Sequence, residues 1–238
     1  MDSVLYSSHD GIATIKLNRP EYINAFSVQM RDDLYEVLKL FQYDIESDVA
    51  IICGAGPKGF CSGADITEFG TAPSQIVARS VRESRDLWGL FLEIEKPIIA
   101  SVHGYVIGSG VEISLLCDIR ISSSDASFSM PEISLGFLPA AAGTQTLPKF
   151  IGLNNTLDFI LTRKVLSSKD ALSIGLVDRV VDIENLESES LTLAKNIRNM
   201  NQHLIRAAKK SVSISDEFPI QDGILLEKRI FQRFQSVI

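Results

Sequence analysis

Residues 95–123, EKPIIASVHGYVIGSGVEISLLCDIRISS, decide the fold class of this chain. Ile98–Val102 follows Pro97 and is almost wholly apolar, which predicts a strand that is buried on both faces. A glycine-containing turn then leads into a short apolar helix at Ser109–Leu116, and Asp118–Ser122 predicts another strand. A strand, a helix and a strand in this order indicate an α/β protein.

The N-terminal part of the chain continues this alternation. Val4–Tyr6 and Ile12–Leu17 are β-rich runs on either side of a turn, which predicts a hairpin. Ser27 is a typical N-cap, and apolar residues at helical spacing follow it to about Asp44. The other elements predicted before Pro97 are a strand at Val49–Cys53 and a long helix at about 75–94.

The C-terminal part of the chain is predicted to be an all-helical tail on the α/β body. Helical patterns cover about 155–163, 168–174, 188–199, 202–213 and 221–236. There is no linker rich in Pro, Gly or Ser between body and tail, so the tail is expected to pack on the body or on a neighbouring subunit.

Composition excludes several classes of protein. The 238 residues are 45% hydrophobic and carry a net charge of −7, which indicates an ordinary folded protein and makes nucleic acid an unsuitable partner. Cys53, Cys61 and Cys117 are odd in number and lie in apolar stretches, as free thiols in a reducing compartment would, and they predict no disulfide framework or zinc site.

No targeting segment is predicted. The first ten residues, MDSVLYSSHD, fit neither a secretory signal nor a transit peptide, and we expect the mature protein to start here. The longest uncharged stretch, residues 97–111, is shorter than the roughly 20 apolar residues that span a bilayer. We therefore expect a cytoplasmic protein that does not bind membranes.

Glu112 is the candidate catalytic residue with the strongest signal. It lies in VEISLLC, where a buried carboxylate without a partner would cost several kcal/mol. The alternatives are a structural acid paired with a distant Arg or Lys, and a functional acid beside the glycine turn Gly108–Gly110. That turn lets a ligand approach the backbone closely, but it matches neither a phosphate-binding loop nor the dinucleotide fingerprint.

A further turn, Phe60–Asp65, offers backbone N–H groups around Ser62 and Gly63, and two such donors are able to form an oxyanion hole. Glu132, in SFSMPEISLG, is expected at the mouth of a loop, where an acid is usually a surface residue. Glu132 is a candidate catalytic residue only because it would form a pair with Glu112.

Several motifs, in order, resemble the enoyl-CoA hydratase/isomerase (crotonase) superfamily, and the resemblance covers nearly the whole chain. They are the stretch quoted above together with IKLNRPEYINAFS (15–27), GFCSGADI (59–66), ASFSMPEISLGFLPAAAGTQTLPKFIG (126–152) and SKDALSIGLVDRVV (168–181). The resemblance implies an α/β crotonase-like ββα spiral core at residues 1–185. It also implies a C-terminal helical region at 186–238 that serves trimerisation, in a homotrimer or a dimer of trimers.

The same resemblance implies a lyase of fatty acid metabolism that adds water to an enoyl-CoA thioester, with Glu112 and Glu132 as the catalytic acids. The implied oxyanion hole is made by the backbone N–H groups of Ser62 and Ser109. No cofactor is implied, because coenzyme A is part of the substrate, and no metal is implied. The alternatives are an enoyl-CoA isomerase, which needs one base only, and a non-catalytic acyl-CoA-binding subunit.

The substrate- and CoA-binding residues implied by the resemblance lie in both turns and in the loop after the first strands. They are Tyr22, Ile23, Ala25, Gly63, Ala64, Asp65, Ile66, Gly108, Pro139 and Ala140. Asp65 is more typical of a helix cap than of a ligand contact. The residues expected to line the acyl pocket include Trp88, Leu90, Phe91 and Phe137, of which Trp88 and Phe91 are more typical of a core.

The sequence departs from the family pattern in two places. Ala140 and Ala142 stand where many hydratases have glycine, and the added methyl groups would crowd a close-packed site. The resemblance implies that position 140 lies beside the attacking water. An isomerase, or a hydratase for an unusual acyl group, would also fit. The chain ends at FQRFQSVI, before the usual family end, so we expect a pocket that is more open, covered by a neighbouring subunit, or suited to a carrier-bound substrate.

Overall fold

The structure is a computed structural model and describes residues 3–74, 76, 80 and 83–235. Within these residues, the main sheet has the strand order β1-β2-β3-β4-β6-β9, in which β1 and β2 are antiparallel and the other neighbours are parallel. Its strands are β1 (Val4–His9), β2 (Ile12–Leu17), β3 (Val49–Gly54), β4 (Ile98–Val102), β6 (Ile119–Ser123) and β9 (Arg179–Val181). The expected hairpin is present, and its turn residues Asp10 and Gly11 both have positive φ angles.

A smaller sheet joins β5 (Tyr105–Ile107), β7 (Ser127–Ser129) and β8 (Leu166–Ser167). The all-helical tail was therefore a wrong prediction, because β8 pairs with β7, and β9 extends the main sheet beside β6. Strands of two and three residues are too short to show a period of two in the sequence. Their conformation depends on pairing with strands that lie far away along the chain.

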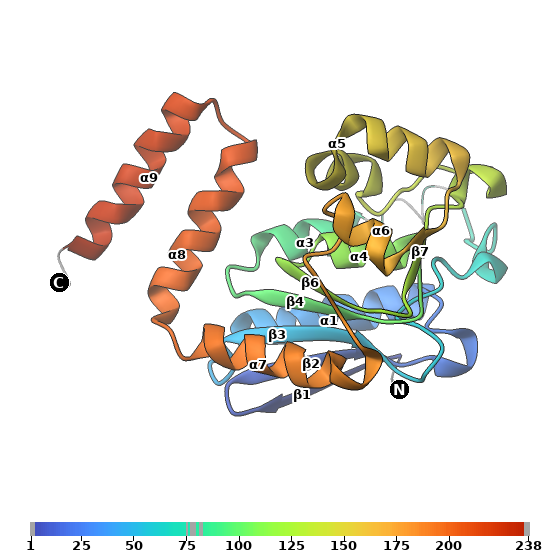
Figure 1. The fold of residues 1–238 in the computed structure, drawn as a ribbon, viewed down its shortest axis with the longest axis horizontal. Helices are drawn as coiled ribbons and strands as arrows, with labels where there is room; N and C mark the ends of the chain where they lie inside the picture. The colour runs from blue at the N-terminus through green and yellow to red at the C-terminus, as the bar shows by residue number, and fades with distance from the viewer. Residues whose placement is uncertain (1–2, 75, 77–79, 81–82, 236–238) are drawn as a thin grey trace.

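Helices cover both faces of the main sheet. They are α1 (Val28–Tyr43), α3 (Leu87–Glu93), α4 (Ser109–Leu115), α5 (Gly143–Thr162), α6 (Ser168–Ser173), α7 (Leu186–Arg198), α8 (Gln202–Ser213) and α9 (Ile220–Gln235). The main core lies between the sheet and helices α1, α3, α4 and α5, whereas α7 closes a smaller core on the opposite face (Figure 1).

Two helix predictions differ from the structure. The helix expected at 155–163 is the second half of α5, which begins at Gly143, contains Pro148 and bends at Gly152. Proline and glycine are signals of loops, which explains why its first half was missed. Of the helix expected at 75–94, the described residues 76, 80, 83 and 84 are helical, and the helix is interrupted at 85–86 before α3, whose N-cap is Asp86. Residues 75, 77–79 and 81–82 lie outside the described residues.

Helices α8 and α9 lie on the left of Figure 1, where α9 stands away from the body and α8 contacts it. Ion pairs join α8 to residues just before three strands of the main sheet: Arg206 to Asp48 at 3.0 Å, Lys210 to Glu95 at 3.0 Å and Lys209 to Asp118 at 2.8 Å. The two helices expose large apolar side chains, among them Leu204, Val212, Ile220, Ile224, Leu225 and Phe231.

No described helix is long and apolar enough to cross a membrane. Cys53, Cys61 and Cys117 are free thiols, of which Cys61 and Cys117 are buried and Cys53 is half-buried. In the part of the chain that the structure describes, no cluster of three His, Cys, Asp or Glu side chains is placed to hold a metal ion.

Candidate active site

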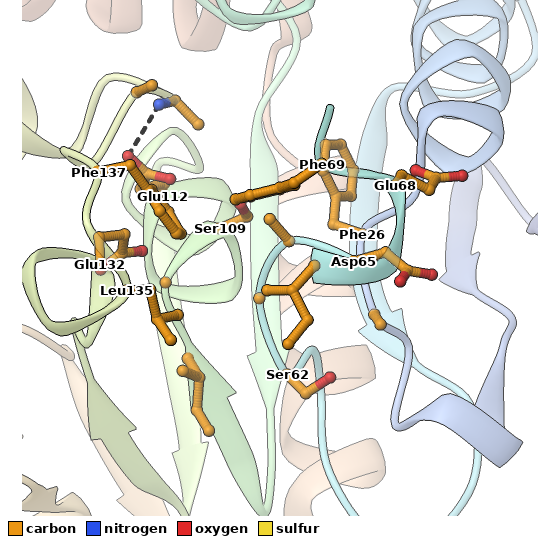
Figure 2. A pocket seen from close by; sticks show the side chains of 18 of the residues that line it. Phe26, Ser62, Asp65, Glu68, Phe69, Ser109, Glu112, Glu132, Leu135 and Phe137 are labelled. Atoms are coloured by element: carbon orange, nitrogen blue, oxygen red, sulfur yellow. Dashed lines mark hydrogen bonds between the residues drawn. The ribbon is translucent and has the colours of Figure 1, made fainter. Parts of the chain in front are cut away.

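A cavity of about 520 Å³ lies where the start of α4, the 3-10 helices η2 (Ile66–Glu68) and η3 (Glu132–Leu135), and the loop between η3 and α5 meet. We call it the main cavity. Figure 2 shows Glu112 and Glu132 on one side of it, and Phe26, Asp65, Glu68 and Phe69 on the opposite side. Apolar side chains make up most of its wall, as is usual for a small-molecule site.

Glu112 is only 2% exposed, and backbone groups hold its carboxyl group. The N–H groups of Ala141 and Gly143 both donate to Oε1, each at 2.9 Å, and a dashed line in Figure 2 marks a hydrogen bond to this residue. Burial raises the pKa of Glu112 from 4.5 to about 7; the two N–H donors oppose the rise, and the nearby charge of Glu132 adds to it.

Glu132 begins η3 and is only 6% exposed, so it is not the surface acid that is usual at such a position. Its Oε2 atom is buried and has no hydrogen-bond partner in the described structure. Burial raises the pKa of its carboxyl group. Gly108 leaves the room it needs, because a Cβ atom at position 108 would lie 2.3 Å from Oε1 of Glu132.

Ser109 is the first residue of α4. The helix does not use the N–H of its first residue, and within the described residues Ser109 N has no hydrogen-bond acceptor. Gly108 has φ 50° and ψ −113° and donates to Ser129 O at 2.9 Å, which fixes the entry into the helix. Ser109 lines the main cavity, so this N–H is a free donor for a ligand.

Ser62 does not offer the expected free N–H. Its backbone N–H donates to Ile23 O at 3.0 Å, and its hydroxyl group donates to Tyr22 O at 3.2 Å. The free donor of this turn is two residues further on. Ala64 forms a parallel bridge with Phe26, in which Phe26 N bonds Gly63 O and Asp65 N bonds Phe26 O.

In a parallel bridge, the N–H of the central residue points away from its partner strand. The N–H of Ala64 therefore points away from Phe26, and it has no acceptor among the described residues. Ala64 also lines the main cavity. The assignment of a backbone donor to Ser62 is thus corrected to Ala64, which had been assigned to CoA binding.

The residues expected to bind substrate or CoA fall into two groups. The main cavity is lined by Ala25, Gly63, Ala64, Asp65, Ile66, Gly108 and Ala140. Tyr22, Ile23 and Pro139 lie outside its lining. Asp65 acts as the expected cap, since it is the N-cap of η2, and it also pairs with Arg19 at 3.0 Å.

The pocket prediction holds for two of four residues. Trp88 and Phe137 line the main cavity, whereas Leu90 and Phe91 are buried in the main core. Sequence reasoning missed other lining residues, namely Phe26, Val28, Arg31, Glu68, Phe69 and Leu135. These residues lie around the start of α1, η2 and η3, which are far apart along the chain, so no local pattern identifies them.

The two departures in the 140–142 loop have different outcomes. Ala140 lines the main cavity, so its methyl group adds to the wall beside Glu112. Ala142 does not line the cavity and instead has φ +73°, in the left-handed region. Its methyl group therefore leaves the cavity unchanged, and its cost is a strained backbone.

Comparison with known proteins gives consistent matches. The family model described as "Enoyl-CoA hydratase/isomerase" matches residues 7–237. A probable enoyl-CoA hydratase of Mycobacterium leprae is 36% identical over 231 residues, which are 97% of this chain and 88% of that protein. A probable mitochondrial enoyl-CoA hydratase of Dictyostelium discoideum is 37% identical over 223 residues, which are 92% of this chain and 78% of that protein. The crystal structure of an enoyl-CoA hydratase from Bacillus anthracis has a TM-score of 0.91 and 30% identity, and the match covers 97% of this chain and 90% of that one.

Proposed function

This chain belongs to the enoyl-CoA hydratase/isomerase family, and on that premise we propose that it adds water across the 2,3 double bond of an enoyl-CoA thioester. Its fold is the expected crotonase-like fold, with a C-terminal helical region. One observation carries the proposal: two buried carboxyl groups with different surroundings face one cavity that also has two free backbone N–H donors.

The two N–H groups would activate the substrate. We assign the N–H groups of Ala64 and Ser109 to the thioester oxygen, which becomes negatively charged when water attacks C3. Donors fixed by the backbone need no reorganisation during the reaction, and one such donor is typically worth about 2.7–4 kcal/mol.

The two glutamates would divide the proton transfers. Glu112 accepts two N–H bonds at Oε1, which favours its ionised form, so we assign it as the base that deprotonates water. Glu132 has no donor at Oε2, which favours its protonated form, so we assign it as the acid that protonates C2. A C3–O bond and a C2–H bond form while the double bond is lost, and the proton gained by Glu112 balances the one lost by Glu132. The pair titrates as a unit.

The proposed assembly is a homotrimer or a dimer of trimers. Its support is the apolar surface that α8 and α9 expose at one side of the body (Figure 1). Such patches are typical of subunit contacts. We propose no cofactor other than the coenzyme A carried by the substrate.

The test is the loss of enoyl-thioester absorbance when the purified protein meets crotonyl-CoA, compared with Glu112→Gln and Glu132→Gln. We expect both variants to lose about 10²- to 10⁴-fold in kcat. Full hydration by Glu112→Gln would exclude the two-carboxylate mechanism. Conjugation formed from a 3-enoyl-CoA, without hydration of crotonyl-CoA, would instead establish the isomerase.

A further inference from the structure

The loop between η3 and α5 holds Glu112 by an unusual backbone arrangement. Ala142 is one of the few described residues other than glycine with a positive φ angle, at +73°. The residues on either side of it, Ala141 and Gly143, direct their N–H groups at the same oxygen, Oε1 of Glu112. Neighbouring N–H groups around a left-handed residue form a concave site for an anion.

This left-handed conformation is disfavoured for alanine, so the surrounding structure must maintain it. Ala142 packs against the main core, Ala141 is buried, and Gly143 begins α5. A side chain at position 143 would crowd the carboxyl group, because a Cβ atom there would lie 2.7 Å from Oε1 of Glu112. The loop and the carboxyl group therefore fit each other closely.

The two oxygens of Glu112 have different environments. Oε1 accepts both N–H groups, whereas Oε2 has no hydrogen bond within the described part of the chain. Oε2 of Glu112 is also not fully buried, whereas Oε2 of Glu132 is fully buried without a hydrogen-bond partner. Oε2 of Glu112 is thus the oxygen that remains accessible from the main cavity.

We propose that Ala141 and Gly143 are positioning residues, which fix Oε1 of Glu112 through the left-handed turn at Ala142 and leave Oε2 as the only oxygen that takes the proton from water. This inference rests on the proposed hydratase function. It adds a role for the backbone of the 141–143 loop, in which the N–H groups act through Glu112 and do not touch the substrate.

Gly143→Ala tests the inference. The atoms nearest to the new methyl group are Oε1 and Cγ of Glu112 and Cε of Met130, which all belong to flexible side chains and not to the backbone, and alanine favours a helix more than glycine does. We therefore expect a folded protein with a displaced carboxyl group. Its kcat should fall about 10²-fold with little change in KM, and the acid limb of kcat/KM should move to higher pH, because displaced N–H donors no longer favour ionised Glu112.

Two further variants keep the test decisive. Glu112→Asp retains the carboxyl group but retracts it from the N–H groups, without any crowding, and should move the acid limb in the same direction. Gly223→Ala is the matched control, because it also replaces a helical glycine, in α9, and its Cβ atom would meet nothing within 4 Å. It should leave the pH profile and kcat unchanged.

A readout without substrate separates this inference from the proposed function. Carbon-13 NMR follows the titration of the Glu112 carboxyl group, whose signal is identified by its loss in Glu112→Gln. A Glu112 that titrates at the same pH in wild type and Gly143→Ala would overturn the positioning role, even if the wild type is an active hydratase. The pKa of Glu112 could instead rise clearly in Gly143→Ala while the wild type hydrates no enoyl-CoA. This result would overturn the hydratase function and the role of Oε2, and only the contact between the loop and the carboxyl group would be retained.

Discussion

Ser109→Pro removes one proposed oxyanion donor while keeping the helix that carries it. Proline is well tolerated at the first position of a helix, where the N–H has no partner within the helix. Ser109 has this position in α4, and its N–H has no acceptor among the described residues. The preceding residue is Gly108, which has no Cβ and lies outside the α region that a following proline disfavours.

The expected loss of activity in Ser109→Pro follows from the removal of one N–H donor. One oxyanion donor is worth about 2.7–4 kcal/mol of transition-state stabilisation. At about 1.36 kcal/mol per tenfold change in rate, Ser109→Pro should lower kcat for hydration about 10²- to 10³-fold. The free energy of unfolding should change little, because no hydrogen bond of the folded state is removed.

The assay is hydration of crotonyl-CoA under saturating conditions, together with thermal unfolding and the binding of a saturated acyl-CoA. Ser109→Ala separates the backbone from the side chain, because it removes the hydroxyl group and keeps the N–H. It should lose far less activity than Ser109→Pro. A folded Ser109→Pro variant with wild-type kcat would refute the donor role, and an equal loss in Ser109→Ala would assign the effect to the hydroxyl group.

Three further predictions concern stability. Ala142→Gly should raise the free energy of unfolding in urea by about 1 kcal/mol, since relief of a left-handed alanine, about 1–2 kcal/mol, exceeds the entropic cost of glycine, about 0.4–1 kcal/mol. Burial raises the pKa of Glu112 from 4.5 to about 7, so the folded state holds the proton of this carboxyl group more tightly than the unfolded state does. The stabilisation that results is complete below pH 4.5 and is lost as the pH rises through 7. Glu112→Gln should therefore be more stable than wild type at pH 8, by thermal unfolding, but not at pH 4. Lys209→Ala breaks the half-buried pair with Asp118 and the hydrogen bond that Lys209 Nζ donates to Lys96 O at 2.9 Å, and should cost about 1–2 kcal/mol; the part due to the ion pair shrinks when urea unfolding is repeated at high salt.

The parts of the fold that local patterns specify were predicted well. Ile98–Val102 is a fully buried strand as expected, and Ser27 caps α1 through a hydrogen bond from Met30 N. Strand β9 and the first half of α5 were missed for opposite reasons. Pairing with β6 makes a strand of three residues that have no periodic pattern, and tertiary packing keeps Pro148 inside a helix.

In the candidate site, the burial of a side chain could be predicted from the sequence, but the direction of backbone groups could not. The burial of Glu112 was foreseeable from its apolar neighbours. The free backbone donor near Ser62 was not, because it depends on where the carbonyl group of Ile23 points, and Ile23 has a positive φ angle. The two N–H bonds to Glu112 likewise depend on the left-handed Ala142, which the sequence pattern does not reveal.

The central claim is that Glu112 and Glu132 add water to an enoyl-CoA thioester. Its most direct test is the reaction of crotonyl-CoA in water enriched in heavy oxygen, with the product analysed by mass spectrometry. We expect a 3-hydroxyacyl-CoA with one heavy oxygen on C3, formed by the wild type and lost in the Glu112→Gln, Glu132→Gln double variant. Unchanged crotonyl-CoA, or a labelled product formed equally well by the double variant, would contradict it.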